Sequence, residues 1–199
     1  MIPDREQAEQ LLSWANELNP GAWIDHSRTV ARAAETIAGK CRLDANRAFV
    51  SGLLHDIGRY EGFRELHHIY AGYELLNAKG YDLIADICLS HSFPTGNIGE
   101  FFGKNDCEPE EIETIKTFLS GRAYSDYDKL IQLCDSIGTA AGVTLIEVRV
   151  IDVIRRHGFN DMSLNKIEAY FELKTYFDKL CGVNIYDLFY GEIREVSFR

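Results

Sequence analysis

Apolar residues recur at helical spacing along almost the whole chain, whereas the alternating pattern typical of β-strands is nearly absent. Proline, glycine and asparagine interrupt this periodicity at intervals and so mark the ends of successive helices. The pattern therefore predicts an all-α fold. The first expected helix begins after Pro3 and ends at about 18, and the second carries Val30 to Ala38. Further helices are expected at about 44–57, 65–79 and 81–92, from 109 onwards, around 130–137, and at about 144–157 and 163–181.

Size and composition predict one domain over residues 1–199. A chain of 199 residues with 46% apolar content is long enough for one sizeable core. Its start, MIPDREQAEQ, lacks the features of a secretory leader, and no run of about 18 apolar residues occurs. The five cysteines are scattered without a C-x-x-C pair, which predicts reduced thiols. We therefore expect a soluble, cytoplasmic protein that does not associate with membranes.

The charge balance disfavours one class of partner. The chain has 21 basic and 31 acidic residues and a net charge of −10, which argues against binding of nucleic acid through bulk electrostatics. A small anionic substrate would require a local concentration of positive charge. No feature of the sequence indicates an oligomeric state.

Five ionisable side chains lie on apolar helix faces, where an isolated charge would be unstable. His26 shares a face with Val30 and Ile37, and Asp56 follows Leu53 on another. The remaining members of the set are His68, His91 and Asp135. A buried carboxylate must find a partner or become protonated. Any one of these residues alone is more simply a hydrogen-bonded core residue, but a shared metal cluster would satisfy all of them together.

Two further histidines are expected to have other roles. His67 is adjacent to His68 and points about 100° away from it on a helix, towards solvent or the surroundings of the cluster. His157 precedes Gly158 at a helix end, where an imidazolium would interact favourably with the helix dipole.

The order of the polar residues resembles that of the HD superfamily of metal-dependent phosphohydrolases. A single histidine, a His-Asp dipeptide and a distant aspartate lie in the segments DHSRTVARAAETIA, SGLLHDIGRY and DKLIQLCDSIG, as His26, His55-Asp56 and Asp135. The segments HHIYAGYELL and ADICLSHS resemble the two additional histidine segments of two-metal members. The resemblance covers about residues 22–142, which implies an HD core there and a C-terminal helical extension over 143–199.

The resemblance implies a set of metal ligands. His26, His55, Asp56 and Asp135 would bind one metal ion, and His68, His91 and a bridging Asp56 would bind a second. In a one-metal member, His68 and His91 would hold a substrate phosphate instead. Imidazole and carboxylate ligands suit divalent transition metals; the resemblance favours iron or manganese, and nickel, cobalt and zinc also fit.

The implied reaction is hydrolysis of a phosphate ester, with a nucleotide or a related small phosphorylated metabolite as the expected substrate. Two metal ions would activate a bridging hydroxide and stabilise both oxygens of an in-line displacement. His55 and Asp56 are therefore the expected catalytic residues.

Candidate substrate contacts lie outside the ligand set. Arg59, Arg122 and Lys129 are candidates to neutralise phosphate oxygens, although basic residues at a surface are usually solvated. Phe101 and Phe102 lie in the loop from Ser92 to Pro109, which follows the helix that carries His91. The loop is therefore expected to form part of the substrate pocket, unless its phenylalanines merely attach it to the core.

Two other functions fit the same ligand pattern. One is a diiron oxygenase of the same fold, and the other is a regulatory module that binds nucleotides without turnover. A cyclic-dinucleotide phosphodiesterase is disfavoured, because His91 is followed by SFPTGNIG rather than by the Gly-Tyr-Pro segment of those enzymes. Hydrolysis is preferred because every ligand position is filled.

Overall fold

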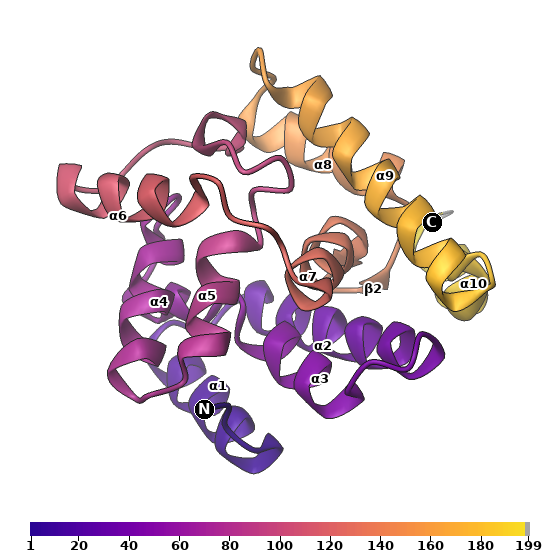
Figure 1. The fold of residues 1–199 in the computed structure, drawn as a ribbon, viewed down its shortest axis with the longest axis horizontal. Helices are drawn as coiled ribbons and strands as arrows, with labels where there is room; N and C mark the ends of the chain where they lie inside the picture. The colour runs from indigo at the N-terminus through magenta and orange to yellow at the C-terminus, as the bar shows by residue number, and fades with distance from the viewer. Residues whose placement is uncertain (198–199) are drawn as a thin grey trace.

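The other helices surround helix α7 (Asp126–Ile137), which packs against helices from both the N-terminal and the C-terminal half of the chain (Figure 1). The structure, a computed structural model, describes residues 1–197. In the described part, helices are joined by loops and 3₁₀ turns, and one two-stranded sheet is present, so the all-α prediction is confirmed. The α-helices are α1 (Arg5–Leu18), α2 (Ala22–Lys40), α3 (Ala45–Leu54), α4 (His67–Ala78), α5 (Asp82–Ser90), α6 (Pro109–Leu119), α7 (Asp126–Ile137), α8 (Ile146–His157), α9 (Ser163–Cys181) and α10 (Tyr190–Ser197).

Helices α2 and α3 pack closely against each other and form part of the hydrophobic core. At Gly52 a Cβ atom would lie only 2.7 Å from the Ala31 Cα, so the two helices approach closely because this residue has no side chain. Asp44 caps α3 by accepting a hydrogen bond from the Arg47 amide at 3.0 Å. Central helix α7 packs against α2, α3 and α5, so its Asp135 comes next to His26 of α2, which is far away in sequence.

A second layer is formed by α4, α5 and α6 together with the 3₁₀ turn η1 (Ile57–Glu61). Leu66, Ile69, Leu89, Phe93 and Ile115 form the buried cluster between these elements. This layer packs the segment after His55-Asp56 directly against α4.

The C-terminal helices continue the hydrophobic core of the first half. Val150, Tyr170 and Phe177 belong to the same buried cluster as Val30 and Ile131. The 3₁₀ turn η3 (Ile185–Phe189) and α10 extend this cluster at the end of the described chain. In Figure 1, α9 runs diagonally across the upper right of the molecule towards α10, with α8 beside its first half.

The structure differs from the sequence prediction at three places. Helix α3 ends at Leu54 rather than at about 57; a turn at His55-Asp56 follows, and η1 begins at Ile57. A hairpin of two short strands, β1 (Gly138–Thr139) and β2 (Gly142–Val143), follows α7. Helix α10 was not expected from the sequence. Such short elements carry too few residues to show a periodicity. Within residues 1–197, the helices lack the combination of length and hydrophobicity that a bilayer-spanning segment needs.

Candidate active site

Three side chains from three helices form the first half of a histidine and aspartate cluster. Nε2 of His26 on α2 lies 3.0 Å from Oδ1 of Asp135 on α7, and Nε2 of His55, at the end of α3, lies 3.8 Å from the same oxygen. One donor atom from each of the three residues lies within 4.8 Å of the others. These side chains therefore could hold one metal ion.

Asp56 is the centre of the second half. Its Oδ1 lies 3.0 Å from Nε2 of His68 and 3.6 Å from Nε2 of His91, while its Oδ2 lies 4.0 Å from Nε2 of His55. Donor atoms of His55, Asp56 and His91 also lie within 4.8 Å of one another. The six residues expected as ligands thus meet in one place, with His55 common to both groups.

Three of the histidines are oriented by the same backbone device. The ring Nδ1 of His55 donates to the Gly52 carbonyl at 2.7 Å, and Nδ1 of His91 donates to the Cys88 carbonyl at 2.8 Å. His68 makes the equivalent bond to the Glu65 carbonyl. Each carbonyl belongs to the residue three positions earlier, and each bond leaves Nε2 facing the carboxylates.

This arrangement fits a metal site. Metal-binding histidines typically donate their second nitrogen to a carbonyl or a carboxylate, which fixes the tautomer and the ring orientation. The buried Nε2 of His55 has no hydrogen-bond partner among the described residues. A buried nitrogen without a partner is costly in an ordinary core, but it is what a ligand requires.

The electrostatics of the cluster favour neutral imidazoles and ionised carboxylates. Burial lowers the pKa of His26, and it lowers the pKa of His91 to about 3. Burial alone would raise the pKa of Asp135, but its hydrogen bond from His26 and the nearby histidines outweigh this effect and bring the pKa below its usual range. Asp56 behaves in the same way, because Arg59 and the histidines stabilise its charge. Both protonation states are those that metal binding requires.

Arg59 lies directly beside the cluster. Its Nε donates to Oδ2 of Asp56 at 2.6 Å, and its Nη2 lies 3.5 Å from Nε2 of His68. The guanidinium is partly exposed and lines the same cavity as the cluster. It therefore places a positive charge at the cavity wall directly beside the cluster.

The cluster opens into a cavity of about 590 Å³, a volume in the range of small-molecule sites. Phe101 and Phe102 line it, as expected for the loop over residues 92–109. The Phe101 ring centre lies 6.4 Å from that of His68. Phe93, in contrast, is fully buried in the cluster between α4, α5 and α6, so it attaches the loop to the core.

The opposite wall of the cavity comes from the C-terminal helices, which the sequence did not connect with the site. Helix α8 contributes Arg149 and Arg156, and α9 contributes Lys166 and Tyr170. Lys166 is 3% exposed; its Nζ donates to the Ser92 carbonyl at 2.8 Å and lies 4.9 Å from the Phe102 ring centre. Burial lowers the pKa of Lys166 to about 8, so it remains mostly charged at neutral pH.

Two expected substrate contacts lie elsewhere. Neither Arg122 nor Lys129 lines the cavity. The Arg122 guanidinium stacks on Phe118 and binds Asp86 at 3.1 Å, and the Lys129 ammonium lies 3.9 Å from Asp126. Their positive charges are therefore matched by neighbouring carboxylates.

The remaining histidines differ from each other. His67 lies between two carboxylates, with 2.9 Å from Nδ1 to Glu111 and 2.9 Å from Nε2 to Glu61. Cys107 lies near this group, but both ring nitrogens of His67 are already occupied by the glutamates. His157 is the last residue of α8, as expected, and it also lines the cavity. Burial and the neighbouring Arg156 lower its pKa, so the expected imidazolium is disfavoured.

Comparison with known proteins decides the family. The family model described as HD domain matches residues 23–140, which is more than half of the chain and contains all six residues of the cluster. The chain belongs to the HD domain family. The resemblance inferred from the sequence is thereby confirmed, and α8 to α10 lie outside the matched HD domain.

Individual relatives are more distant. Ribonuclease Y of Chlorobaculum tepidum is 45% identical over 53 residues, which are 27% of this chain and only 10% of that protein. Among solved structures, the HD domain of the L. monocytogenes phosphodiesterase PgpH in complex with cyclic-di-AMP is 20% identical, with a TM-score of 0.48, and the alignment covers 87% of this chain and 94% of that one. The same domain described without that ligand also has 20% identity and a TM-score of 0.48, with 86% and 95% covered.

Proposed function

We propose that this HD domain protein is a metal-dependent phosphohydrolase that acts on a small phosphorylated molecule, with a nucleotide as the preferred class. The observation that carries the proposal is the placement of the cluster at the base of a cavity that also contains fixed cations. Membership of the HD family and the metal-compatible donor atoms support the metal dependence.

The cavity concentrates positive charge on a chain that is acidic overall. Five basic residues line it, against two carboxylates outside the cluster, Glu65 and Asp152, although the chain has a net charge of −10. The basic residues are Arg59, Arg64, Arg149, Arg156 and Lys166. The carboxylates of Asp56 and Asp135 in the same cavity would be neutralised by bound metal ions. A phosphorylated substrate therefore meets a net positive surface there. This is the local concentration of positive charge that an anionic substrate needs on an acidic chain.

The chain's own groups have separate tasks in this proposal. Asp56 and His55, the proposed catalytic residues, would hold the metal together with His26, Asp135, His68 and His91. A divalent ion in such a site polarises a phosphoryl oxygen and makes water a stronger nucleophile. Arg59 and Lys166 orient the phosphate by donating hydrogen bonds, since the Lys166 ammonium has three protons and only one is used by Ser92.

The aromatic side chains suit a nucleotide. Phe101 and Phe102 line the cavity close to the cluster, and an aromatic face binds a base by stacking with little dependence on its identity. Trp23 also lines the cavity, from the first turn of α2. These surfaces support a substrate that carries a planar group in addition to its phosphate.

The test is a comparison of metal content and hydrolysis in matched variants. Purified protein reconstituted with iron or manganese is assayed against phosphomonoesters, phosphodiesters and nucleotides, and its metal is quantified. We expect Asp135→Asn to lower metal content and hydrolysis together. Asp161→Asn, which changes an exposed aspartate outside the cavity, should leave both unchanged.

The same assays separate the alternatives. A metal-loaded protein that releases no product from any compound contradicts the proposal. Consumption of oxygen by the iron form would identify an oxygenase, and tight nucleotide binding without product would identify a regulatory module.

A further inference from the structure

A second group of metal-compatible side chains lies outside the cavity, where η1 and α6 pack against α4. One donor atom each of His67, Cys107 and Glu111 lies within 4.8 Å of the other two. None of these three residues lines the cavity, and none belongs to the histidine and aspartate cluster. The group is therefore separate from the candidate active site.

The two ring nitrogens of His67 have different carboxylate partners. Nδ1 lies 2.9 Å from Oε2 of Glu111, and Nε2 lies 2.9 Å from Oε2 of Glu61. Without a metal, a proton must lie between the nitrogen and the oxygen of each contact. A metal ion can replace the proton at Nδ1, while Nε2 keeps its proton and donates to Glu61. A metal-binding histidine is typically oriented in this way, by a carboxylate at its second nitrogen.

Backbone amides hold the donors of the group in place. Oε2 of Glu111 accepts from the Glu108 amide at 2.9 Å, as part of the capping box of α6. Asp106, the neighbour of Cys107, accepts from the His67 amide at 2.8 Å. The chain before α6 is thus fixed to the start of α4. Donors from two separate segments are held together before an ion arrives, which reduces the entropy lost on binding.

The charge around His67 favours a cation. The carboxylates of Glu61, Asp106 and Glu111 lie around this one imidazole. A protonated His67 and Arg64, whose charge acts on Glu61, neutralise at most two of the three negative charges. The side chains of His67 and Glu111 are 17% and 16% exposed, so an ion can reach them from solvent and still be largely enclosed.

The donor atoms indicate which metal fits. A nitrogen, an oxygen and a sulfur donor suit zinc, whereas manganese, calcium and magnesium prefer oxygen donors. Burial and the neighbouring carboxylates raise the pKa of Cys107 to about 12, so the thiol keeps its proton in the metal-free protein. A coordinated zinc ion displaces that proton, because the thiolate is the ligand.

We propose that His67, Cys107 and Glu111 form a zinc site, with a water molecule as the fourth ligand and Glu61 as the positioning residue that orients His67. The ion would join the start of α4 to α6 and to the end of the loop over residues 92–109. The inference does not rest on the proposed function, because its ligands take no part in the proposed reaction.

Cobalt distinguishes this site from the cluster. Cobalt can replace zinc in tetrahedral sites, and a cobalt-thiolate bond absorbs strongly in the near ultraviolet, whereas imidazole and carboxylate ligands do not. Among the described residues, the metal-compatible groups of the cluster contain no cysteine. The full chain, freed of zinc by a chelator and reloaded with manganese, is titrated with cobalt chloride under reducing conditions. The thiolate band should appear and saturate, and added zinc should abolish it.

Matched variants assign the band to the site. Cys107→Ser should abolish it, whereas Cys181→Ser, at another partly buried cysteine, should retain it. Glu61→Gln should keep the band at saturation but raise the Kd for cobalt about 10- to 100-fold, because only the orienting carboxylate is lost. His67→Gln and Glu111→Gln remove ligands and should raise the Kd further.

Each outcome has a defined meaning. Absence of the thiolate band in the wild-type protein overturns the zinc site. A band with unchanged Kd in both His67→Gln and Glu111→Gln also overturns it, because Cys107 would then bind cobalt alone. Asp135→Asn, which should empty the cluster, should keep the band. A band in a protein that hydrolyses nothing keeps the zinc site and rejects the enzyme, whereas hydrolysis without the band keeps the enzyme and rejects the zinc site.

Discussion

Gly58 determines how closely the segment after His55-Asp56 approaches α4. A Cβ atom at this position would overlap the His68 carbonyl oxygen and the Gly72 amide nitrogen, and both are backbone atoms that cannot rotate away. The close approach brings Nε2 of His68 within 3.0 Å of Asp56. The absence of one side chain therefore helps to set the geometry of the cluster.

Gly58→Ala should damage both stability and the cluster. The added methyl group must push η1 away from α4, so we expect a loss of about 1–3 kcal/mol in the free energy of unfolding and a lower metal content. Gly39→Ala is the matched control, because a Cβ there meets nothing within 4 Å inside helix α2. It should raise stability by about 0.5–1 kcal/mol. Urea unfolding of the two variants measures both effects, and a neutral Gly58→Ala would contradict the packing argument.

Sequence reasoning found five of the six polar residues of the cluster because each one interrupts an apolar helix face, and it found His55 through the resemblance of the His-Asp dipeptide to the HD pattern. It could not find Lys166, since a lysine within an amphipathic helix normally predicts a solvated position. Only the docking of α9 against Ser92 and Phe102 shows that this lysine is buried. Arg122 is the opposite case: its partners Asp86 and Asp128 come from other helices, and their proximity depends on the fold.

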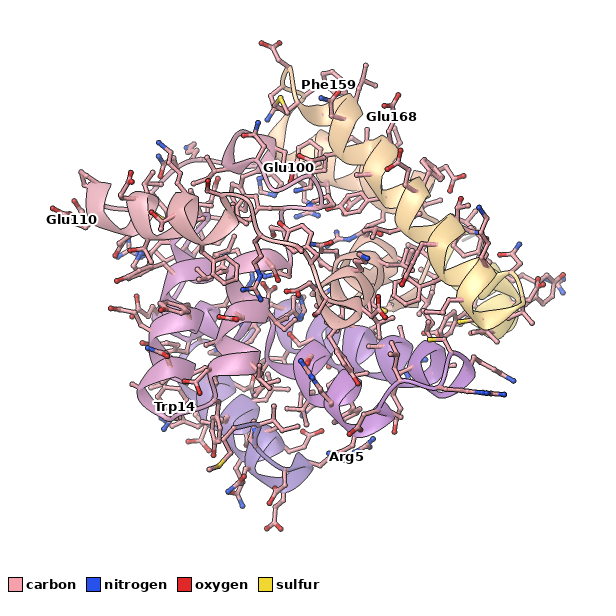
Figure 2. The ribbon with its side chains drawn as sticks, viewed as in Figure 1. Arg5, Trp14, Glu100, Glu110, Phe159 and Glu168 are labelled. Atoms are coloured by element: carbon pink, nitrogen blue, oxygen red, sulfur yellow. The ribbon has the colours of Figure 1, made fainter. Side chains whose placement is uncertain are left out.

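The loop over residues 92–109 combines a buried, anchored part with a part that lines the cavity. Glu100, labelled in Figure 2, is fully buried and accepts hydrogen bonds from the Thr95 amide at 3.0 Å and from its hydroxyl at 2.8 Å. Together with buried Phe93, it closes the first part of the loop on itself. Phe101 and Phe102 come immediately after this closed part and line the cavity.

Removing either cavity-lining phenylalanine should affect substrate rather than metal. If a base stacks on these rings, Phe101→Ala or Phe102→Ala should lower nucleotide turnover about tenfold or more, since stacking contributes about 1–3 kcal/mol per base. Metal content should not change. Phe159→Ala is the control, because Phe159 is exposed, lies outside the cavity and is found at the upper edge of the molecule in Figure 2. Unchanged turnover in both test variants, or joint loss of metal and folding, would make the loop purely structural.

One carboxylate of helix α10 binds to the first half of the chain, in addition to the hydrophobic contacts of this helix. Glu192 accepts from Nη1 of Arg32 at 2.8 Å and from Nη2 at 2.5 Å, and Oε1 also accepts from the Val143 amide at 2.9 Å. Burial would raise the pKa of Glu192, but these hydrogen bonds lower it below its ordinary value of 4.5. One side chain thus joins α2, β2 and α10.

Glu192→Gln should lose stability in a pH-dependent way. Because the pKa is lower in the folded state, the stabilisation by Glu192 is fully present above about 4.5 and is lost as the pH falls through the folded pKa. We expect the variant to be about 1 kcal/mol less stable at neutral pH, since the pair is partly exposed. The difference should shrink in acid. Denaturant unfolding of both proteins over this range measures it, and a difference that persists in acid would assign the effect to packing.

Docking of the C-terminal helices was not predictable from their patterns, although two of them were expected at nearly the observed positions. The amphipathic faces of α8 and α9 indicate that they bury a surface, but not which one. In the structure, Phe177 and Ile185 complete a cluster that begins with Val30 and Ile37 on α2. The HD domain matched at residues 23–140 therefore shares its hydrophobic core with residues beyond it.

Phe177→Ala should reveal whether the whole chain unfolds as one domain. Phe177 is fully buried in the shared cluster, so truncation should cost about 3–5 kcal/mol. In a single cooperative unit, hydrogen exchange would accelerate equally for the most protected amides of α9 and of α2. Faster exchange confined to α9, with α2 unchanged, would instead indicate two units that unfold separately.

The division of the cavity between two parts of the chain has an evolutionary consequence. The six residues of the cluster lie within the HD domain, whereas Arg149 and Arg156 lie on a helix beyond it. The cavity-facing residues of α8 can therefore change without disturbing the cluster, provided that core residues such as Ile146 and Val150 are kept. Substitutions on this single helix can therefore change the ligand preference. A chimera that takes only the cavity-facing side chains of α8 from a related protein should acquire the ligand preference of that protein.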